Sequence, residues 1–313
     1  MLCRRFNYLV MFAIGCGLTL AACANSTPSS SSEPEVNPDS VSTQTGAIAS
    51  AERIVALTSL SADLVRHLDS SKLIGVPGSS LIAGDSRFEG IEHVSSERTP
   101  PNLEKVVALN PDLVIGAAGF HESTADRLKE AGIPTLLTEV DSWQSLQELT
   151  EILATTLDAD PTNLLQRYDA CSAEAPNRSP STLVLVSYQP ILSPNQNSWA
   201  GDFLKRFNIQ NLTTDVQDDG ADSVSGQQFE GYISLSSEIV LQADPDMLFV
   251  VNAGDDTLKQ FEANPFWQEL KATQTSNVHT FDYYGLINPG SLRSIEATCE
   301  KLSQVVSEQN SLE

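Results

Sequence analysis

Two stretches of the chain repeat the same order of an amphipathic segment, a proline and an apolar run. Residues 99–119 read Thr-Pro-Pro-Asn-Leu-Glu-Lys-Val-Val-Ala-Leu-Asn-Pro-Asp-Leu-Val-Ile-Gly-Ala-Ala-Gly, and residues 236–253 follow the same pattern, with Glu238 at the position of Glu104. A polar N-cap, a carboxylate in the first turn and a terminating proline predict a short helix in each copy. The continuous apolar run that follows predicts a strand covered on both faces. One copy in each half of the chain indicates two related lobes.

From residue 53 onward, apolar runs of strand length alternate with amphipathic stretches of helix length. The expected strands are residues 53–57, 73–76, 113–115, 135–137, 182–186, 247–251 and 278–281. The expected helices are residues 61–68, 102–110, 125–131, 141–156, 160–174, 203–207, 236–244, 265–270 and 292–306. Strands separated by helices pair in parallel with right-handed crossovers. The sequence therefore predicts an α/β fold with two lobes of mainly parallel strands, residues 51–157 and 179–313, joined by a connecting helix in residues 158–178.

Residues 1–22 have the composition of an export signal. Arg4 and Arg5 form its positive end, and the apolar stretch that follows is shorter than the ~20 residues that a spanning helix needs. The sequence Leu-Ala-Ala-Cys at residues 20–23 resembles a bacterial lipobox, which implies cleavage before Cys23 and attachment of lipid to that residue. The alternative is an ordinary signal peptide with an incidental cysteine. Residues 23–50 carry few large apolar side chains and predict a flexible, lipid-anchored tether.

The chain is strongly acidic. Its formal net charge is −23 at pH 7, and loss of Arg4 and Arg5 with the signal makes it −25 (−23 − 2), because residues 1–22 contain no acid. So acidic a chain is a poor candidate for binding nucleic acid or an anionic membrane surface. Of its five cysteines, Cys171 and Cys299 remain in the folded part, in an oxidising compartment if the chain is exported. The sequence alone does not establish that their Cα atoms come close enough to pair, so both states stay open.

Small molecules bind to open α/β sheets beyond the carboxyl ends of the strands. Two facing lobes would bring those ends into one cleft, lined by the residues that follow the strands and by nearby aromatic or basic side chains. These candidates are Ser59, Leu60, Ser79, Ser80, Phe120, His121, Tyr188, Gln189, Asn252, Tyr283 and Tyr284, with Arg98, Trp199 and Arg293. The tyrosine pair is favoured because two consecutive tyrosines cannot both face one core. Trp143 and Trp267 are expected in the core instead.

Catalytic and metal-binding motifs are absent from the sequence. It contains no Gly-x-Ser-x-Gly, His-Glu-x-x-His, phosphate-loop or Gly-x-Gly-x-x-Gly pattern. Of the four histidines, His67 is expected inside a helix and His279 inside a strand, which leaves His93 and His121 as a weak pair of metal ligands. These absences disfavour hydrolytic enzymes. We expect no cofactor and no directly bound metal, with bare-metal binding as a minor alternative.

Four groups of residues occur in a specific order: Arg53-Ile-Val-Ala-Leu, Leu73-Ile-Gly-Val, Asn102-Leu-Glu with Asn110-Pro-Asp-Leu-Val-Ile, and Ser237-Glu with Asp244-Pro-Asp. Over residues 52–308 the chain resembles the substrate-binding lipoproteins of ABC importers for iron complexes and cobalamin. The resemblance implies the class III periplasmic-binding-protein fold, in which two Rossmann-like lobes are joined by a rigid interdomain helix. It also implies a monomeric, non-enzymatic receptor, anchored by lipid in the periplasm or at the cell surface. Its partners would be an ABC permease and the ATPase of that importer.

The family carries one exposed Glu on each lobe, which pairs with arginines of the permease. Glu104 and Glu238 match those positions. The alternative role for each carboxylate is support of the helix dipole, worth about 0.3–1 kcal/mol. The two roles are compatible, and the matched placement on two lobes favours docking.

Residues 98–104, Arg-Thr-Pro-Pro-Asn-Leu-Glu, are similar to the Arg-Thr-x-Pro-Asn-Leu-Glu of hydroxamate-siderophore binders. In those proteins the Arg contacts iron-bound oxygens and an aromatic residue after the next strand lines the pocket, which implies these roles for Arg98 and Phe120. Siderophore binders often have Tyr at the second position, and cobalamin binders tend to have Trp at the first. Arg98 could also pair with Glu92 or Glu97.

The resemblance thus implies an iron(III)–siderophore complex as the ligand. The expected ligand-binding residues are Ser59, Ser80, Arg98, Phe120, His121, Tyr188, Trp199, Tyr283, Tyr284 and Arg293. Cobalamin or haem in the same fold is one alternative. A structural or sensory lipoprotein without a transported ligand is the other.

Overall fold

The computed structural model describes residues 50–96, 99–172, 179–213, 231–253 and 256–311. These residues all belong to one compact unit, residues 41–313. The expected signal peptide, Cys23, most of the tether and Arg98 lie outside the described residues. Within the described ranges, no helix is both long enough and apolar enough to span a membrane.

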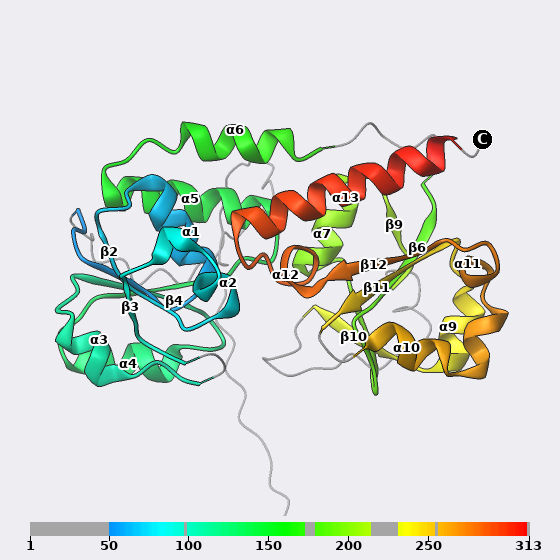
Figure 1. Cartoon of the computed structure of the whole chain (residues 1–313), viewed down its shortest axis with the longest axis horizontal. Helices are drawn as coiled ribbons and strands as arrows, with labels where there is room; N and C mark the ends of the chain where they lie inside the picture. Colours follow the sequence, from blue (N-terminus) through cyan, green and yellow to red (C-terminus); the bar gives the residue numbers. More distant parts are fainter. Residues whose placement is uncertain (1–49, 97–98, 173–178, 214–230, 254–255, 312–313) are drawn as a thin grey trace, which may run out of the picture. The chain divides into compact units, whose positions relative to one another are not determined.

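The first half of the unit contains a five-stranded parallel sheet in the order β3-β2-β1-β4-β5. Its strands are β1 (Ile54–Ala56), β2 (Leu73–Val76), β3 (Glu92–His93), β4 (Leu113–Ala117) and β5 (Thr135–Thr138). Its helices are α1 (Ser59–Leu68), α2 (Ser80–Ala83), η1 (Ser86–Phe88), α3 (Leu103–Ala108), α4 (Glu122–Glu130) and α5 (Trp143–Leu157). Figure 1 shows α1 and α5 on one face of this sheet and α3 and α4 on the other. The parallel pairing expected from the sequence is confirmed.

The second half contains a four-stranded parallel sheet in the order β12-β11-β6-β9. Its strands are β6 (Ser181–Leu185), β9 (Gln210–Asn211), β11 (Met247–Asn252) and β12 (Val278–Asp282). The helices are α7 (Trp199–Arg206), α9 (Ser237–Ala243), α10 (Thr257–Glu262), η3 (Pro265–Glu269), α11 (Lys271–Gln274), α12 (Tyr283–Leu286) and α13 (Leu292–Ser311). The last helix continues past residue 306, where the apolar pattern predicts its end.

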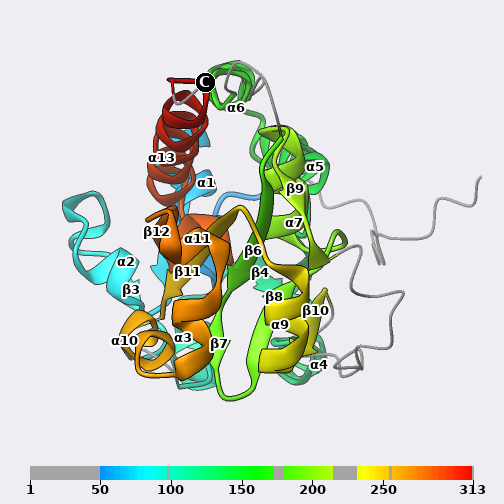
Figure 2. The same ribbon diagram turned by 90° about the vertical axis from the view of Figure 1, so that its right-hand side faces the viewer.

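A small antiparallel sheet in this half was not expected from the sequence. It has the order β10-β8-β7 and consists of β7 (Ser187–Tyr188), β8 (Ile191–Pro194) and β10 (Tyr232–Leu235). Figure 2 shows the β7–β8 hairpin projecting at the bottom of the view. None of these three strands carries the continuous apolar run by which the strands of the parallel sheets were expected.

The repeated unit forms the same structure twice. The side chain of Asn102 caps α3 by accepting from the Lys105 N–H at 3.1 Å, and Ser236 caps α9 in the same way. The aspartate after each proline then binds the start of the first strand of its sheet. The Asp112 carboxylate accepts from the backbone N–H groups of Glu52 and Arg53 at 2.8 and 2.9 Å, and Asp246 accepts from that of Ser181 at 3.3 Å.

One buried apolar cluster runs through both halves. On β1, Ile54 belongs to this cluster while the next residue, Val55, faces a separate cluster under α3 and α4, so this strand is covered on both faces. The shared cluster includes Trp143 of α5, Phe203 of α7 and Leu302 of α13. A third cluster, which contains Trp267, lies under α9 and α10. Trp143 and Trp267 are thus core residues, as expected.

The connecting segment contains α6 (Thr162–Ala170), which is shorter than the helix expected in residues 160–174. Cys171 ends it with non-helical backbone angles and forms a disulfide with Cys299 of α13, with the two Cα atoms 5.4 Å apart. Of the two states that the sequence left open for Cys171 and Cys299, the structure has the disulfide. The lobe boundaries at residues 157–158 and 178–179 stay a prediction.

Candidate functional site

A cavity of about 950 Å³ lies at the carboxyl ends of β1, β2, β11 and β12. The site residues expected from the sequence that line it are Ser59, Ser80, Asn252, Tyr283, Tyr284 and Arg293. Its volume is within the usual range of small-molecule sites, roughly 300–1,000 Å³. The cavity therefore lies where ligand sites are expected in open α/β sheets, beyond the carboxyl ends of parallel strands.

The first wall comes from α1, α2 and η1. Ser59 begins α1 directly after β1, and its hydroxyl lies 2.6 Å from that of Ser79, which caps α2. Ser80, the first residue of α2, joins it in the lining. Hydroxyl groups on two neighbouring helix starts thus form the polar part of this wall.

A charged network of Asp63, Asp85 and Arg87 forms the floor of the cavity on the same side. Arg87 on η1 binds Asp85 through Nε at 3.1 and 3.0 Å, and its Nη2 lies 2.9 Å from Asp63 Oδ1. Burial raises the pKa of Asp63, but hydrogen bonds from His67 and Leu292 and the charges of His67 and Arg87 outweigh it, so the net shift is downward. Asp63 is therefore a buried carboxylate held in its charged form.

The opposite wall comes from β12, α12 and α13. The rings of Tyr283 and Tyr284 meet edge to face with centroids 5.4 Å apart, and 37% of Tyr283 is exposed. Burial, followed by the charge of the neighbouring Tyr284, raises the pKa of Tyr283, so its phenol is a hydrogen-bond donor at neutral pH. The expectation that these tyrosines line the cleft agrees with the lining of the cavity.

Two further cations lie on this wall. Lys301 donates to the carbonyl of Thr280 and stands 4.9 Å from the centre of the Phe281 ring. Arg293, on the first turn of α13, is exposed and makes no hydrogen bond or ion pair within the described part of the chain, although its charge contributes to lowering the pKa of Asp85. Arg293 is consequently the cavity cation best placed to meet an incoming acceptor.

Trp199 does not line the cavity, which corrects the expectation from its sequence context. It begins α7 rather than lying in a loop, because Ser198 caps the helix by accepting from the Gly201 N–H at 3.1 Å. Only 3% of its surface is exposed, and its indole N–H donates to the carbonyl of Gly285 at 2.7 Å. The segment Ser-Trp-Ala-Gly was predicted to be a loop because Ser198 was not recognised as a helix N-cap.

Three other expected ligand residues also lie outside the cavity lining. Tyr188 packs edge-on against Phe261 and accepts from the Asn264 side chain at 2.6 Å. His121 accepts from the Ala117 N–H at 2.9 Å through Nδ1, and burial lowers its pKa. Phe120 is 69% exposed. A ligand role for these three residues stays a prediction, and Arg98 lies outside the described residues.

The sequence did not single out several lining residues. Asp63, Asp85, Arg87 and Lys301 all contribute to the cavity surface. Asp63 could have been found as a carboxylate among apolar neighbours in α1, where a charge is costly without a partner. The other three lie on ordinary polar segments and give no local signal.

Glu104 and Glu238 occupy matching exposed positions in the first turns of α3 and α9. Hydrogen bonds from the backbone of Glu238 itself and from Ser236 lower the pKa of Glu238. Neither carboxylate lines the cavity. Among the described residues, no group of three or more His, Cys, Asp or Glu side chains is arranged to hold a metal ion.

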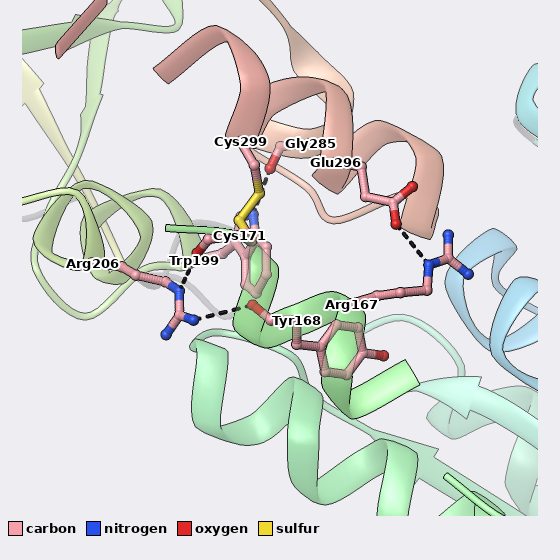
Figure 3. The surroundings of a disulfide bond; sticks show 8 residues. All are labelled: Arg167, Tyr168, Cys171, Trp199, Arg206, Gly285, Glu296 and Cys299. Carbon is pink, nitrogen blue, oxygen red and sulfur yellow. Dashed lines mark hydrogen bonds and ion pairs between the residues drawn. A yellow bond between two sulfur atoms is a disulfide. The ribbon is translucent and has the colours of Figure 1, made fainter. Parts of the chain in front are cut away.

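Figure 3 shows a group of contacts around the Cys171–Cys299 disulfide, which we call the junction. Arg206 of α7 donates through Nε to the carbonyl of Cys171 at 2.7 Å and through Nη2 to that of Tyr168 at 3.1 Å. Arg167 of α6 binds Glu296 of α13 at 2.7 Å. Together with the disulfide, these bonds join α6 to two helices of the second half.

The chain matches one protein family and several known proteins. The sequence pattern of the family described as Periplasmic binding protein matches residues 54–284. An iron-uptake system-binding protein of Bacillus subtilis (strain 168) is 24% identical over 265 residues, 77% of this chain and 80% of that protein.

Two solved structures share the fold. A periplasmic vitamin B12 binding protein of Vibrio cholerae has a TM-score of 0.62 at 19% identity, with 83% of this chain and 98% of that chain covered. A periplasmic heme-binding protein from Roseiflexus sp. RS-1 has a TM-score of 0.63 at 20% identity, with the same coverage.

Proposed function

The chain belongs to the periplasmic binding protein family, and on that basis we propose that it is the non-enzymatic substrate-binding lipoprotein of an ABC importer with a ferric siderophore as its ligand. Lipid on Cys23 would hold it at the membrane, in the periplasm or at the cell surface. It would capture the chelate in the cavity and deliver it to the permease and its ATPase.

The observation that carries the ligand assignment is the pairing of two phenols with an exposed guanidinium in one cavity. A ferric siderophore presents iron-bound oxygens, which are hydrogen-bond acceptors, on a largely apolar organic frame. Tyr283, Tyr284 and Arg293 supply donors, while Leu81 and Phe88 supply apolar surface. A charge-assisted hydrogen bond from Arg293 would contribute about 1.5–3 kcal/mol to binding.

The similarity to an iron-uptake protein over 77% of the chain supports an iron complex. Cobalamin or haem is the second candidate, favoured by the two solved structures with the same fold whose names specify vitamin B12 and heme. The iron complex ranks first here because the name of the sequence relative specifies iron uptake, whereas likeness to the two structures at 19% and 20% identity shows the fold alone. A structural or sensory lipoprotein is the alternative of another class.

Thermal unfolding of the chain from residue 24 tests the proposal. It is measured alone and with ferrioxamine B, ferric citrate, haem or cyanocobalamin. A ligand at ~100 times its dissociation constant adds about 2.7 kcal/mol to the free energy of unfolding. We expect this shift with ferrioxamine B. The variant Arg293→Gln should weaken binding by about 10- to 100-fold, and the sequence resemblance leads us to expect the same direction for Arg98→Ala.

Arg127→Gln is the matched control, because Arg127 is an exposed arginine on α4 that does not line the cavity. A shift with haem or cyanocobalamin alone would keep the family and replace the ligand. Absence of a shift with all four compounds would remove the transport proposal and favour the structural or sensory alternative.

A further inference from the structure

Trp199 lies between the junction and the ligand cavity without touching the cavity itself. Its indole ring is buried, and its N–H donates to the Gly285 carbonyl at 2.7 Å (Figure 3). Gly285 directly follows Tyr283 and Tyr284, the two aromatic residues of the cavity wall. A single hydrogen bond therefore connects a core tryptophan to the backbone that carries both phenols.

The backbone at Gly285 has little freedom. Its φ of +101° is a conformation that favours glycine, and Tyr284 also departs from helical angles inside α12. A Cβ atom at Gly285 would lie 2.2 Å from Thr298 Oγ1 and 2.3 Å from the Ser294 carbonyl oxygen, both on α13. The kinked backbone at Gly285 thus packs closely against α13 and is hydrogen-bonded to Trp199. The backbone angles of this kink determine the directions of the Tyr283 and Tyr284 side chains.

Trp199 also contacts Phe203 of its own helix and Trp143, which in turn packs against Arg206 of the junction. Its ring stacks on Trp143, the first residue of α5, with centroids 5.6 Å apart and 18° between the planes. The backbone N–H of Trp143 donates to Asp202 of α7 at 2.7 Å, and Arg206 lies 4.4 Å over the Trp143 ring. Trp199 therefore contacts a helix that covers the first sheet and the kinked backbone of α12, which forms part of the cavity wall in the second half.

We propose that Trp199 is a positioning residue. Its hydrogen bond to the Gly285 carbonyl fixes the positions of Tyr283 and Tyr284, so that a change in the contacts of the junction moves both tyrosines in the ligand cavity. This proposal relies on the proposed function only in taking the cavity as the ligand site. It assigns to Trp199 an indirect role in place of the ligand contact expected from the sequence.

Fluorine NMR of the chain from residue 24 labelled with 3-fluorotyrosine tests the positioning without any ligand. Signals are assigned by Tyr→Phe substitution. Trp199→Phe keeps a buried ring but removes the N–H donor, so the Tyr283 and Tyr284 signals should move while that of Tyr188 stays.

Trp267→Phe is the matched control. Trp267 is equally buried and stacks on Phe261, against which Tyr188 packs edge-on. Its replacement should move the Tyr188 signal and leave Tyr283 and Tyr284 unchanged. A general loosening of the fold would instead move all three tyrosine signals in both variants.

The ligand measurement uses ferrioxamine B. Loss of one positioning hydrogen bond should raise its dissociation constant about fivefold in Trp199→Phe, and less than twofold in Trp267→Phe. If Trp199→Phe does not fold, the unaltered chain labelled with 5-fluorotryptophan serves instead: ferrioxamine B should shift the Trp199 signal and not the Trp267 signal.

The proposal is overturned if Trp199→Phe leaves both tyrosine signals in place, or if ferrioxamine B moves the tyrosine signals while that of Trp199 is unchanged. If the unaltered chain binds no chelate, the proposed function fails. The tyrosine comparison without ligand then still decides the role of Trp199.

Discussion

The carboxylate of Asp63 accepts a hydrogen bond from the backbone N–H of Leu292 at 2.8 Å, across 229 residues of sequence. Asp63 lies on α1 beside the first sheet, and Leu292 is the first residue of α13. Helix N-termini leave N–H groups without internal partners and favour a negative charge. Arg87 holds the second oxygen of the same carboxylate at 2.9 Å. A single buried charge therefore joins the two halves at the floor of the ligand cavity.

Asp63→Asn should lower the free energy of unfolding by about 1.5–3 kcal/mol, the range for a hydrogen bond to a charged group. The amide keeps the shape but removes the charge that both Arg87 and the helix N-terminus favour. Urea unfolding at pH 5 measures the loss. Asp69→Asn is the control, because Asp69 ends the same helix and bonds to Ser71 two residues further on. Equal effects of the two substitutions would contradict the special role of Asp63.

The effect of Asp63→Asn on the free energy of unfolding should disappear in acid. Although burial raises the pKa of Asp63, its hydrogen bonds and cationic neighbours bring the net value below the ordinary one. A carboxyl with a lower pKa in the folded state stabilises the fold above its unfolded pKa of about 3.9, and this contribution disappears as the pH falls through the folded pKa. The difference between the unaltered chain and Asp63→Asn should be complete at pH 5 and shrink below about pH 4. A difference that persists undiminished at pH 3 would refute this linkage.

Removal of the Cys171–Cys299 disulfide should lower the free energy of unfolding by about 2–5 kcal/mol. The bond closes a loop with a sequence separation of 128 residues, so it removes much freedom from the unfolded chain. The double variant Cys171→Ser, Cys299→Ser and the reduced unaltered chain should unfold at the same urea concentration, below that of the oxidised chain. Coincident midpoints for all three would mean that the bond adds nothing beyond the neighbouring contacts of Arg206 and Arg167.

The elements of this fold were predictable where the signal is local. The strand expected at residues 247–251 is β11, and Asn102 and Ser236 are the caps that their positions suggest. The expected family and its class III periplasmic-binding-protein fold are confirmed as well. Local patterns suffice for these features because a cap or a buried strand depends on adjacent residues.

The site was predictable only in part, because side-chain roles depend on distant partners. Tyr283 and Tyr284 could be placed by their position after a strand, whereas Trp199 could not, since its partner Gly285 is 86 residues away. Asp63 depends in the same way on Leu292. Neither pairing leaves a trace in the local pattern of apolar and polar residues.

Gly285→Ala should be strongly destabilising and should weaken chelate binding. The added Cβ would clash with Ser294 and Thr298 of α13 in addition to straining a positive φ. Gly132→Ala is the matched control: Gly132 has a φ of +76° at the end of α4, but its Cβ would meet nothing within 4 Å. The control should cost about 1 kcal/mol from the backbone alone, and Gly285→Ala clearly more. Urea unfolding measures the free energy of unfolding of both variants. Equal decreases would show that α13 moves away to accommodate the added Cβ atom of Gly285→Ala.

Glu104→Lys with Glu238→Lys should abolish productive contact with the permease while leaving ligand binding intact. Both carboxylates are exposed on matching first turns and lie outside the cavity. Charge reversal would replace attraction to permease arginines by repulsion, which acts mainly on docking. The measurement is stimulation of the ATPase in the reconstituted importer, with ferrioxamine B affinity as the internal check.

The two readings of these carboxylates predict different results. Support of the helix dipole alone, worth about 0.3–1 kcal/mol each, would lower thermal stability slightly and leave ATPase stimulation unchanged. Glu130→Lys is the control for charge reversal as such, because Glu130 is exposed at the end of α4. If each single reversal reduces stimulation and the double reversal removes it, both lobes contact the permease. Full stimulation by the double variant would leave the dipole as the sole role of the pair.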